Sequence, residues 1–345
     1  MKKILAILTA ERRYAERLCD YCNKKKSLLL TAVPFDSAEA YAAFAAKHDI
    51  EILLADSTML KADSESRTGP ALSGVRAART IGLEDGISFE RAFAESGSTS
   101  VATVNKYQPA ETLIREVMSG CEGRDIYFDA AKPQRPVRVI GVYSPVSRCG
   151  KSSFAITLGR LQAKKHKTLY ISLEEFSCLG MLSRERYDLT LSDAVYHMKQ
   201  GSLTSQRLYS MIHNIGGLEY IPPMRCADDS NAVKGEDYVR LINEIIKNSL
   251  YEVVIIDMDR YADEASELLE ICDTVYMPVL PDAMNRMKAE SFVEYLNASD
   301  RSHIADKLIR INTPEPEHTA LQGLAYLDSL LYGGMGDMVR ELGEA

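Results

Sequence analysis

The sequence predicts an α/β protein of two doubly wound domains, each a parallel or mostly parallel sheet covered by helices. The chain has 345 residues, and a typical domain of roughly 100–200 residues makes two domains the default. Short apolar runs alternate with amphipathic stretches along the chain, which is the order that βαβ units produce. Several runs are apolar without alternation, as expected for strands buried on both faces of a parallel sheet.

The first domain is expected over residues 1–120, and it begins in βαβαβ order. The expected strands are 4–8, 28–33, 50–55 and 101–104, and the expected helices are 11–25, 37–47 and 109–118, the last opened by Pro109. Residues 62–100 are rich in Ser, Gly and Ala and have weak periodicity, so no element is assigned there. The N-terminal lysines and apolar run are read as the first strand and not as a signal peptide, because charged residues follow at once.

Residues 121–136 are expected to form a linker, because they contain Gly, Asp, Lys and two prolines without a clear period. The second domain is then expected over residues 137–345. Its expected strands are 137–142, 168–173, 218–221, 253–256, 274–279 and 308–311, and its expected helices are 152–165, 191–199, 205–212 and 238–247.

The composition of the chain disfavours several functional classes of protein. The formal net charge is −8, which disfavours a protein that coats DNA, since that work needs a basic face. The 7 cysteines are an odd number scattered through a long chain, as in reduced cytoplasmic proteins. Cys19 and Cys22 form one CxxC pair, a weak signal for metal or redox chemistry without a second pair. No apolar run is long enough for a membrane span.

A phosphate-binding loop is predicted in VRVIGVYSPVSRCGKSS, residues 137–153, where a strand leads into a loop that ends at a helix start. A helix N-terminus offers unpaired N–H groups and a partial positive charge to phosphate. Gly150 allows close backbone approach, Lys151 supplies a charge near the β- and γ-phosphates, and Ser152 offers a hydroxyl to Mg²⁺. The usual pattern is GxxxxGK[ST], and Pro145 stands at its first glycine. The alternative is an ordinary strand–loop–helix connection.

A second motif supports the first. The apolar strand 253–256 ends in Asp257, which is the Walker B arrangement: a carboxylate beside the phosphate loop that can hold Mg²⁺. The sequence therefore predicts binding of ATP with Mg²⁺, with Ser152 and Asp257 as the metal residues. The candidate nucleotide-binding residues in the loop are Pro145, Val146, Ser147, Arg148, Cys149, Gly150, Lys151, Ser152 and Ser153.

These motifs and their flanks resemble the MinD/ParA superfamily of deviant Walker A ATPases, and within it the CpaE-type proteins of Flp pilus assembly. The resemblance is carried by YSPVSRCGKSS, YISLEEFSCLG, YEVVIIDMDRYADEASELLEICDTVYMPV and GGMGDMVREL. The family loop reads KGGxGK[ST], so its two glycines fall on Ser147 and Arg148 and its signature lysine on Val146. That lysine normally reaches the partner's nucleotide in a dimer, so Val146 puts dimer-activated hydrolysis in doubt.

The resemblance also implies roles for residues outside the loop. Glu174 aligns with the family acid that orients attacking water, although that residue is usually Asp, and a longer side chain could misplace the water and slow turnover. The resemblance therefore implies Lys151, Glu174 and Asp257 as the catalytic residues. Asp259 could sense the γ-phosphate or cap the next helix.

The adenine is expected against Asn312 and Pro314. Arg148 could contact phosphates as an arginine finger does, or point to solvent.

The first domain resembles response-regulator receivers. Asp56 falls where the phosphoacceptor sits, and Lys106 falls at the receiver lysine. Receivers also need an acidic pair after the first strand, where this chain has Leu8, Thr9 and Ala10 with only Glu11 nearby. Without that pair, phosphoryl transfer loses its metal. The expectation is a pseudo-receiver that binds a protein partner.

The leading hypothesis is a cytoplasmic, slow ATPase that acts as a nucleotide-dependent positioning or assembly factor and forms a homodimer through its ATPase domain. A non-hydrolysing ATP-binding scaffold is the alternative, and a ParA-like DNA-partitioning ATPase is a further one, although the basic clusters at 24–26 and 164–165 are explained by solvated helix surface.

A MinD-like membrane cycle is disfavoured, because residues 319–345 hold four acids and one base. A metabolic kinase is possible on the phosphate loop alone, but no acceptor pocket is indicated. No specific nucleic acid and no stable membrane anchor are expected.

Overall fold

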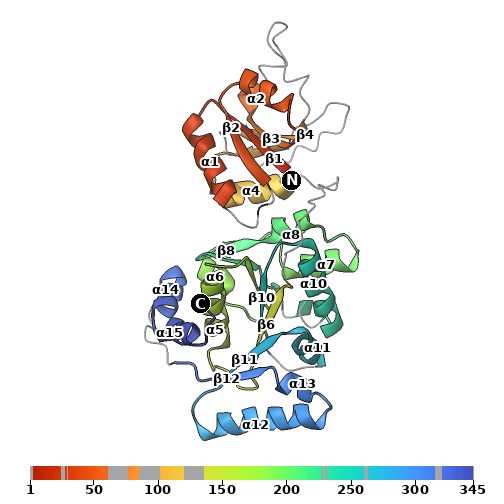
Figure 1. Cartoon of the computed structure of the whole chain (residues 1–345), viewed down its shortest axis with the longest axis vertical. Coiled ribbons are helices and arrows are strands. Elements are labelled where there is room, and N and C mark those ends of the chain that lie inside the picture. Colours follow the sequence, from red (N-terminus) through yellow and green to blue (C-terminus); the bar gives the residue numbers. More distant parts are fainter. Residues whose placement is uncertain are drawn as a thin grey trace. The chain divides into compact units, whose positions relative to one another are not determined.

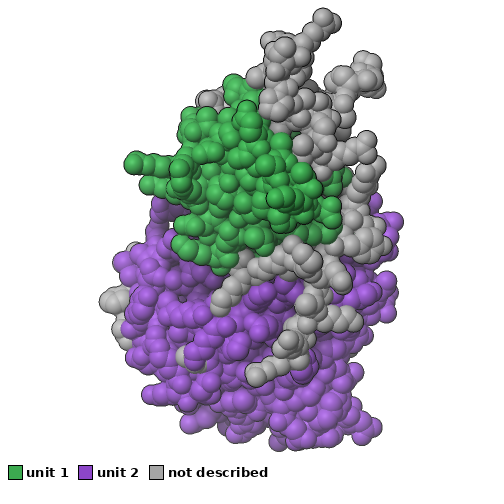
Figure 2. Space-filling view, turned by 45° about the horizontal axis from the view of Figure 1, so that its top comes forward, with its two compact units in different colours: residues 1–130, 204–210 green, residues 131–203, 211–345 purple. Residues whose placement is uncertain are grey.

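A computed structural model of the chain describes residues 3–24, 28, 30–60, 77–84, 102–119, 136–226, 228–229, 232–259, 263–314 and 321–344. Contacts between Cα atoms divide the chain into two compact units (Figure 2). The first unit comprises residues 1–130 and 204–210, and the second comprises residues 131–203 and 211–345. The expected linker, 121–136, lies outside the described residues except for Pro136.

The first unit holds a five-stranded parallel sheet in the order β2-β1-β3-β4-β5 (Figure 1). The strands are β1 (Lys3–Leu8), β2 (Leu30–Phe35), β3 (Ile50–Asp56), β4 (Ala77–Glu84) and β5 (Ala102–Asn105). The helices are α1 (Arg12–Lys24), α2 (Ala38–Ala45) and α4 (Ala110–Ser119). Ser37 caps α2 by accepting a hydrogen bond from the Ala40 amide.

Both faces of this sheet are covered, because successive side chains of each strand point to opposite faces. Leu5 and Ile7 pack with α1 and α4 in one core. Ala6 and Leu8 pack with Tyr41 of α2 in the other core. The first unit is therefore a three-layer α/β/α structure, which explains why its strands read as continuous apolar runs.

The second unit holds a seven-stranded sheet in the order β12-β11-β6-β10-β7-β9-β8. The strands are β6 (Arg138–Val142), β7 (Thr168–Ser172), β8 (His213–Ile215), β9 (Leu218–Ile221), β10 (Val253–Asp257), β11 (Thr274–Pro278) and β12 (Leu308–Ile311). All neighbouring pairs are parallel except the three-residue β8, which runs antiparallel to β9 at one edge. The two motif strands, β6 and β10, lie side by side at the centre of the sheet.

Helices cover both faces of this sheet (Figure 1). The first face carries α5 (Lys151–Gln162), α6 (Leu179–Ser183), α14 (Gly323–Tyr332) and α15 (Gly334–Glu341), which share one core with residues of β6, β7, β10 and β11. The other helices of this unit are α7 (Leu191–Lys199), α10 (Gly235–Asn248), α11 (Asp263–Ile271), α12 (Ala283–Ala298) and α13 (Ser302–Ala305). Helix α8 (Ser205–Met211) lies almost entirely in the segment 204–210 that groups with the first unit. Helix α5 is buried along nearly its whole length, so it is a rigid support for the loop that precedes it.

Most expected elements match the observed ones within a few residues, and the differences have local causes. Strand β4 lies in the stretch where no element was assigned, and β8 is too short to show a period. The helices α6, α11, α12, α13, α14 and α15 were not among the expected elements. No helix in the described residues is long and apolar enough to cross a bilayer.

Candidate functional site

The segment between β6 and α5 is held in a compact turn by its own side chains. The Val146 amide donates to Ser144 Oγ at 3.1 Å, and the Cys149 thiol donates to the Val146 carbonyl at 3.1 Å. Thr313, which follows β12, donates its hydroxyl to the Cys149 carbonyl at 2.8 Å. The loop is thus fixed both by its own side chains and by the segment that follows β12.

Two residues of this loop adopt the left-handed backbone conformation. Gly150 has φ +78° and Arg148 has φ +59°. At Gly150 a Cβ would also lie 3.3 Å from Thr313 Oγ1, so glycine suits this position on both grounds. Arg148 is exposed and adopts a conformation that costs a residue with a side chain about 1 kcal/mol or more.

The backbone N–H groups at the start of α5 are available to a ligand. Within the described chain, none of the amides of residues 147–152 has a hydrogen-bond partner. The first intrahelical bond runs from the Phe154 amide to the Gly150 carbonyl at 2.8 Å. Such a row of unpaired N–H groups, combined with the positive end of the helix dipole, is a site for an anion.

Lys151 lies beside these amides, and its side chain is only 8% exposed. Its ammonium donates to the Asp259 carbonyl at 3.1 Å and lies 3.7 Å from Asp259 Oδ1. A buried ammonium needs an anionic or carbonyl partner to offset its lost hydration. Asp259 supplies that partner here, and a phosphate at the loop would compete for the same charge.

Ser152 and Glu174 meet directly at the first turn of α5. The Ser152 hydroxyl donates to Glu174 Oε1 at 2.6 Å, and Ser172 Oγ lies 3.4 Å from the second carboxylate oxygen. Burial raises the pKa of Glu174, and the hydrogen bond from Ser152 opposes the rise. The acid expected at the end of the second strand therefore contacts the hydroxyl expected at the metal.

Asp257 ends β10 and is completely buried. The Tyr170 hydroxyl donates to Oδ2 at 2.8 Å, whereas Oδ1 has no hydrogen-bond partner in the described chain. Burial, followed by the nearby charge of Glu174, raises the pKa of Asp257 to about 7. A buried carboxylate oxygen without a hydrogen-bond partner destabilises the folded state unless a ligand supplies the missing partner.

These residues fit a Mg²⁺ ion that shares its coordination with a bound phosphate. The donors are a serine hydroxyl and the unpartnered Asp257 oxygen, with the Glu174 carboxylate beside them. No cluster of three or more His, Cys, Asp or Glu side chains suited to a metal occurs among the described residues. Mg²⁺ is commonly held by one or two carboxylates together with water and substrate phosphates, so a complete protein cage is not required.

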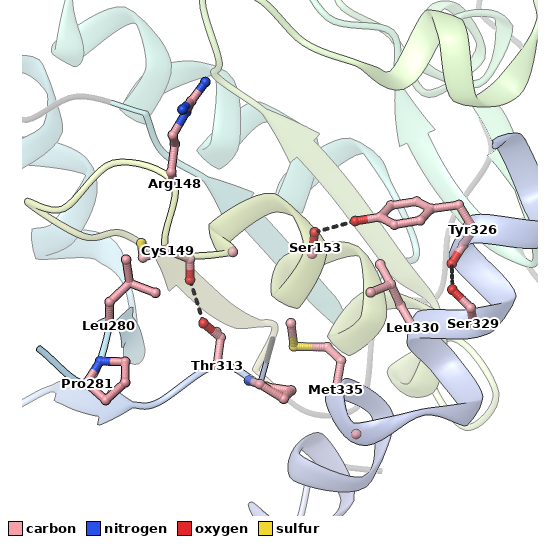
Figure 3. A pocket seen from close by; sticks show the side chains of 13 residues that line it. Arg148, Cys149, Ser153, Leu280, Pro281, Thr313, Tyr326, Ser329, Leu330 and Met335 are labelled. Carbon is pink, nitrogen blue, oxygen red and sulfur yellow. Dashed lines mark hydrogen bonds between the residues drawn. The ribbon is translucent and has the colours of Figure 1, made fainter. Parts of the chain in front are cut away.

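A cavity of about 340 Å³ adjoins the loop (Figure 3). Its walls come from the phosphate-loop segment, from the chain after β11 and β12, and from α14 and α15. The lining residues are Arg148, Cys149, Gly150, Ser153, Leu280, Pro281, Thr313, Pro314, Tyr326, Ser329, Leu330, Gly334 and Met335. The cavity is within the usual size range of small-molecule pockets, and its lining is largely apolar with a few hydroxyl groups.

The expected site residues fall into separate places around the loop. Lys151, Ser152, Glu174 and Asp257 gather at the amide end of α5, whereas Pro314 lines the cavity and Asn312 is not among its lining residues. Val146 is buried, with 3% of its surface exposed. Arg148 points away from the other labelled side chains of Figure 3.

Sequence reasoning missed three residues of the site. Tyr170 fixes Asp257 from the neighbouring strand, and it is found only once β7 and β10 are known to be adjacent. Thr313, which contacts the loop through the Cys149 carbonyl, stands between Asn312 and Pro314, the two residues expected at the adenine. Tyr326 contacts Ser153 Oγ at 3.2 Å across 173 positions of sequence, and no local pattern marks it.

The first unit contains a polar cluster at the carboxyl ends of its strands. The Thr9 hydroxyl donates to Asp56 Oδ2 at 2.5 Å, and the Lys106 ammonium lies 2.7 Å from Glu11 Oε1. Asp56 and Lys106 are both buried. The Asp56 carboxylate therefore accepts a hydrogen bond from a hydroxyl, and the Lys106 ammonium pairs with a carboxylate.

Cys19 and Cys22 are buried on the inner face of α1, where they pack among the apolar side chains of the first core. Both are reduced thiols. Burial raises the pKa of Cys19 to about 12, which disfavours the reactive thiolate. In this structure the CxxC pair is core packing.

No family model and no curated protein matches the chain. Solved structures do match. A ParA family ATPase from Chlorobium tepidum TLS has a TM-score of 0.50 and 16% identity, covering 61% of this chain and 98% of that one. McdA from Cyanthece in its apo form has a TM-score of 0.43 and 14% identity, covering 59% and 98%.

MinD from Aquifex aeolicus has a TM-score of 0.40 and 16% identity, covering 56% of this chain and 78% of that one. The first of the three likenesses shows that the chain contains the α/β fold of a ParA family ATPase, with its largely parallel sheet. The likeness concerns the fold alone.

Proposed function

We propose that the second unit binds ATP with Mg²⁺ at the start of α5 and acts as a slow ATPase that positions or assembles other proteins. The observation that carries this proposal is the row of unpaired amides at residues 147–152 beside the Lys151 ammonium. Together they offer N–H donors and a positive charge to a triphosphate. The buried, unpartnered Asp257 oxygen supports the metal, and the cavity beside Ser153 supports the nucleoside.

The proposed roles follow the positions of the side chains. Lys151 contacts the β- and γ-phosphates after leaving Asp259, and Ser152 and Asp257 hold Mg²⁺ directly or through water. Glu174 orients the attacking water, and Pro314 with Thr313 lies against the base. Bound Mg²⁺ would neutralise charge that develops on the phosphates.

The first experiment is an ATP titration by isothermal calorimetry, with and without Mg²⁺, of the natural chain and Lys151→Ala. We expect the variant to lose at least about 2 kcal/mol of binding free energy, because a charged hydrogen-bond donor is removed. Lys288→Ala, which removes an exposed ammonium on α12, is the matched control and should bind as the natural chain does. Undiminished ATP affinity in Lys151→Ala would contradict the whole site.

A non-hydrolysing ATP-binding scaffold is the second candidate, and two observations favour it. Val146 stands buried where the resemblance places a lysine that reaches the partner nucleotide, and Glu174 is engaged by Ser152. A turnover measurement separates the two functions: tight ATP binding without phosphate release supports the scaffold, and release of phosphate above the buffer rate supports the ATPase.

For the first unit we propose a pseudo-receiver that binds a protein partner. Its strand order, β2-β1-β3-β4-β5, is that of flavodoxin-like folds. Asp56 is paired with Thr9 and Lys106 with Glu11, and after β1 the described residues offer Glu11 without a second acid, where phosphoryl transfer would need a pair to hold a metal. A homodimer formed through the second unit and a cytoplasmic location belong to the same proposal.

A further inference from the structure

One wall of the cavity beside the phosphate loop is built by the last two helices of the chain. Its residues on α14 and α15 are Tyr326, Ser329, Leu330, Gly334 and Met335. Figure 3 shows Tyr326 reaching toward Ser153, with Leu330 and Met335 lying near the centre of the view. The nucleoside half of a ligand held at the loop would therefore rest against these two helices.

Helix α14 is fastened to α5, the helix that carries the phosphate loop. The Tyr326 hydroxyl lies 3.2 Å from Ser153 Oγ, and Arg160 pairs with Asp328 Oδ1 at 2.7 Å. Arg160 is itself held by the Gly216 carbonyl, which accepts from Nε at 3.0 Å. These contacts hold α14 against α5. None of them involves α15.

Helix α15 follows α14 through a very tight turn. A Cβ at Gly336 would lie 2.0 Å from the Leu331 carbonyl oxygen, so only glycine allows the two helices to approach this closely. The Arg340 guanidinium donates to the same carbonyl at 3.0 Å. The two helices therefore form one hairpin, and what holds the end of α15 also determines where the cavity wall lies.

The end of this hairpin is clamped by Glu344, which is 8% exposed. Its Oε1 accepts from Arg138 Nη2 at 2.6 Å and from the Tyr276 hydroxyl at 2.6 Å. Its Oε2 accepts from Arg138 Nη1 at 2.7 Å and from Gln162 Nε2 at 2.7 Å. Gln162 also donates to the Glu344 carbonyl at 2.7 Å.

The partners of Glu344 come from three central elements of the second unit. Arg138 belongs to β6, Tyr276 to β11 and Gln162 to the last turn of α5. Bidentate Arg–carboxylate pairs are strong and geometrically specific, and the two further donors remove the remaining freedom of the carboxylate. These contacts therefore tie the residue three positions after α15 to the same helix whose first turn holds the phosphate loop.

We propose that Glu344 is a positioning residue for the nucleoside half of the ligand, acting through the α14–α15 hairpin and without touching the ligand. This inference rests on the proposed function and extends it. The phosphate half is held separately, because the loop is fixed by Ser144 and Thr313, and neither belongs to the hairpin. Loosening the clamp therefore weakens recognition of the nucleoside and leaves recognition of the phosphates intact.

The test compares two ligands that share phosphates and differ in the nucleoside. ATP and inorganic tripolyphosphate are titrated with Mg²⁺ into the full-length natural chain, Glu344→Ala and Glu341→Ala. Glu341 is an exposed acid at the end of α15, three residues before Glu344, so its variant is the matched control. We expect Glu344→Ala to lose ATP affinity by about tenfold or more, as displaced binding groups do, while its tripolyphosphate affinity changes less than about twofold.

Thermal unfolding is recorded for each variant. If Glu344→Ala has no cooperative transition, Glu344→Gln is used, since it keeps one oxygen acceptor and removes the charge that faces Arg138. Equal loss of both ligands, or no loss of either, overturns the inference. A natural chain that binds neither ligand overturns the proposed function as well, whereas a natural chain that binds ATP with an unaffected Glu344 variant overturns the inference alone.

Discussion

At the scale of single residues, the phosphate loop holds one side chain in a conformation that glycine would adopt more easily. Arg148 has φ +59° and is exposed, while the resemblance places a glycine at this position. Backbone strain of this kind often marks a functional position, since it persists only where something else compensates for it. We therefore expect the guanidinium to contact phosphate when nucleotide binds.

Arg148→Gly tests this expectation. The variant should gain roughly 0.5–1 kcal/mol of unfolding free energy from relief of the left-handed conformation. Its ATP affinity should fall by about tenfold, because a charged donor to phosphate is lost. Chemical denaturation and ATP titration measure the two effects.

Arg148→Ala is the matched control, because it removes the guanidinium and keeps the strain. It should bind ATP as weakly as Arg148→Gly and show no gain in stability. If both variants bind ATP as the natural chain does, Arg148 is a solvent-facing side chain.

Site residues could be predicted from the sequence where their neighbours along the chain form a recognisable motif. Lys151, Ser152 and Asp257 were predicted because a strand end, a loop and a helix start follow one another in the chain. Tyr170 and Tyr326 could not be found in this way, because their partners are 87 and 173 positions away. Their roles depend on which strands and helices become neighbours, and a single sequence does not state that.

At the scale of elements, α5 owes its close packing to a glycine in its interior. A Cβ at Gly159 would lie 2.8 Å from Leu218 Cδ2 of β9, which is completely buried. Glycine lowers intrinsic helix stability relative to alanine by about 1 kcal/mol. The close approach to β9 explains why glycine is nevertheless present.

Gly159→Ala should therefore destabilise the second unit by about 1–3 kcal/mol, since the overpacking outweighs the gain in helix propensity. Urea denaturation measures the change. In a Leu218→Ala background, where space has been made, the same substitution should be neutral or stabilising, and the double-mutant cycle gives the coupling. A stabilised single variant would show that the leucine moves aside without cost.

Elements were predicted best where an apolar run is long and its flanks are polar. The strands 50–55 and 253–256 match β3 and β10 to within a residue at either end. Strand β4 has Arg79 and Gly82 within a weakly periodic stretch, and β8 has only three residues, so neither shows a pattern. The cavity wall on α14 and α15 was not anticipated, because these helices come late in the chain and meet α5 only in the folded unit.

At the scale of the whole second unit, the chain is closed end to end by an ion pair. Arg138 and Glu344 are separated by 206 positions and lie near the two ends of the unit. Burial alone would raise the pKa of Glu344, but hydrogen bonds from Arg138 and Tyr276 outweigh it and lower the pKa below its ordinary value.

This shift has a defined sign in acid. A carboxylate whose folded pKa is lowered stabilises the protein above its unfolded value, about 4.3 for Glu, and this contribution is lost as the pH falls through the folded value. Glu344→Gln should therefore flatten the fall in unfolding temperature below about pH 4.3, measured by calorimetry from pH 3 to pH 6. If the unfolding temperature of the variant falls below about pH 4.3 as steeply as that of the natural chain, the Arg138–Glu344 pair does not stabilise the folded state in this way.

The short reversed strand β8 has a consequence for behaviour at high concentration. A sheet margin made of a long strand with free N–H and C=O groups is a template on which another chain can add. With three residues running against the direction of the rest, β8 offers too little regular backbone for such growth. Fibril formation from that margin is thereby discouraged, whatever nucleotide the protein holds.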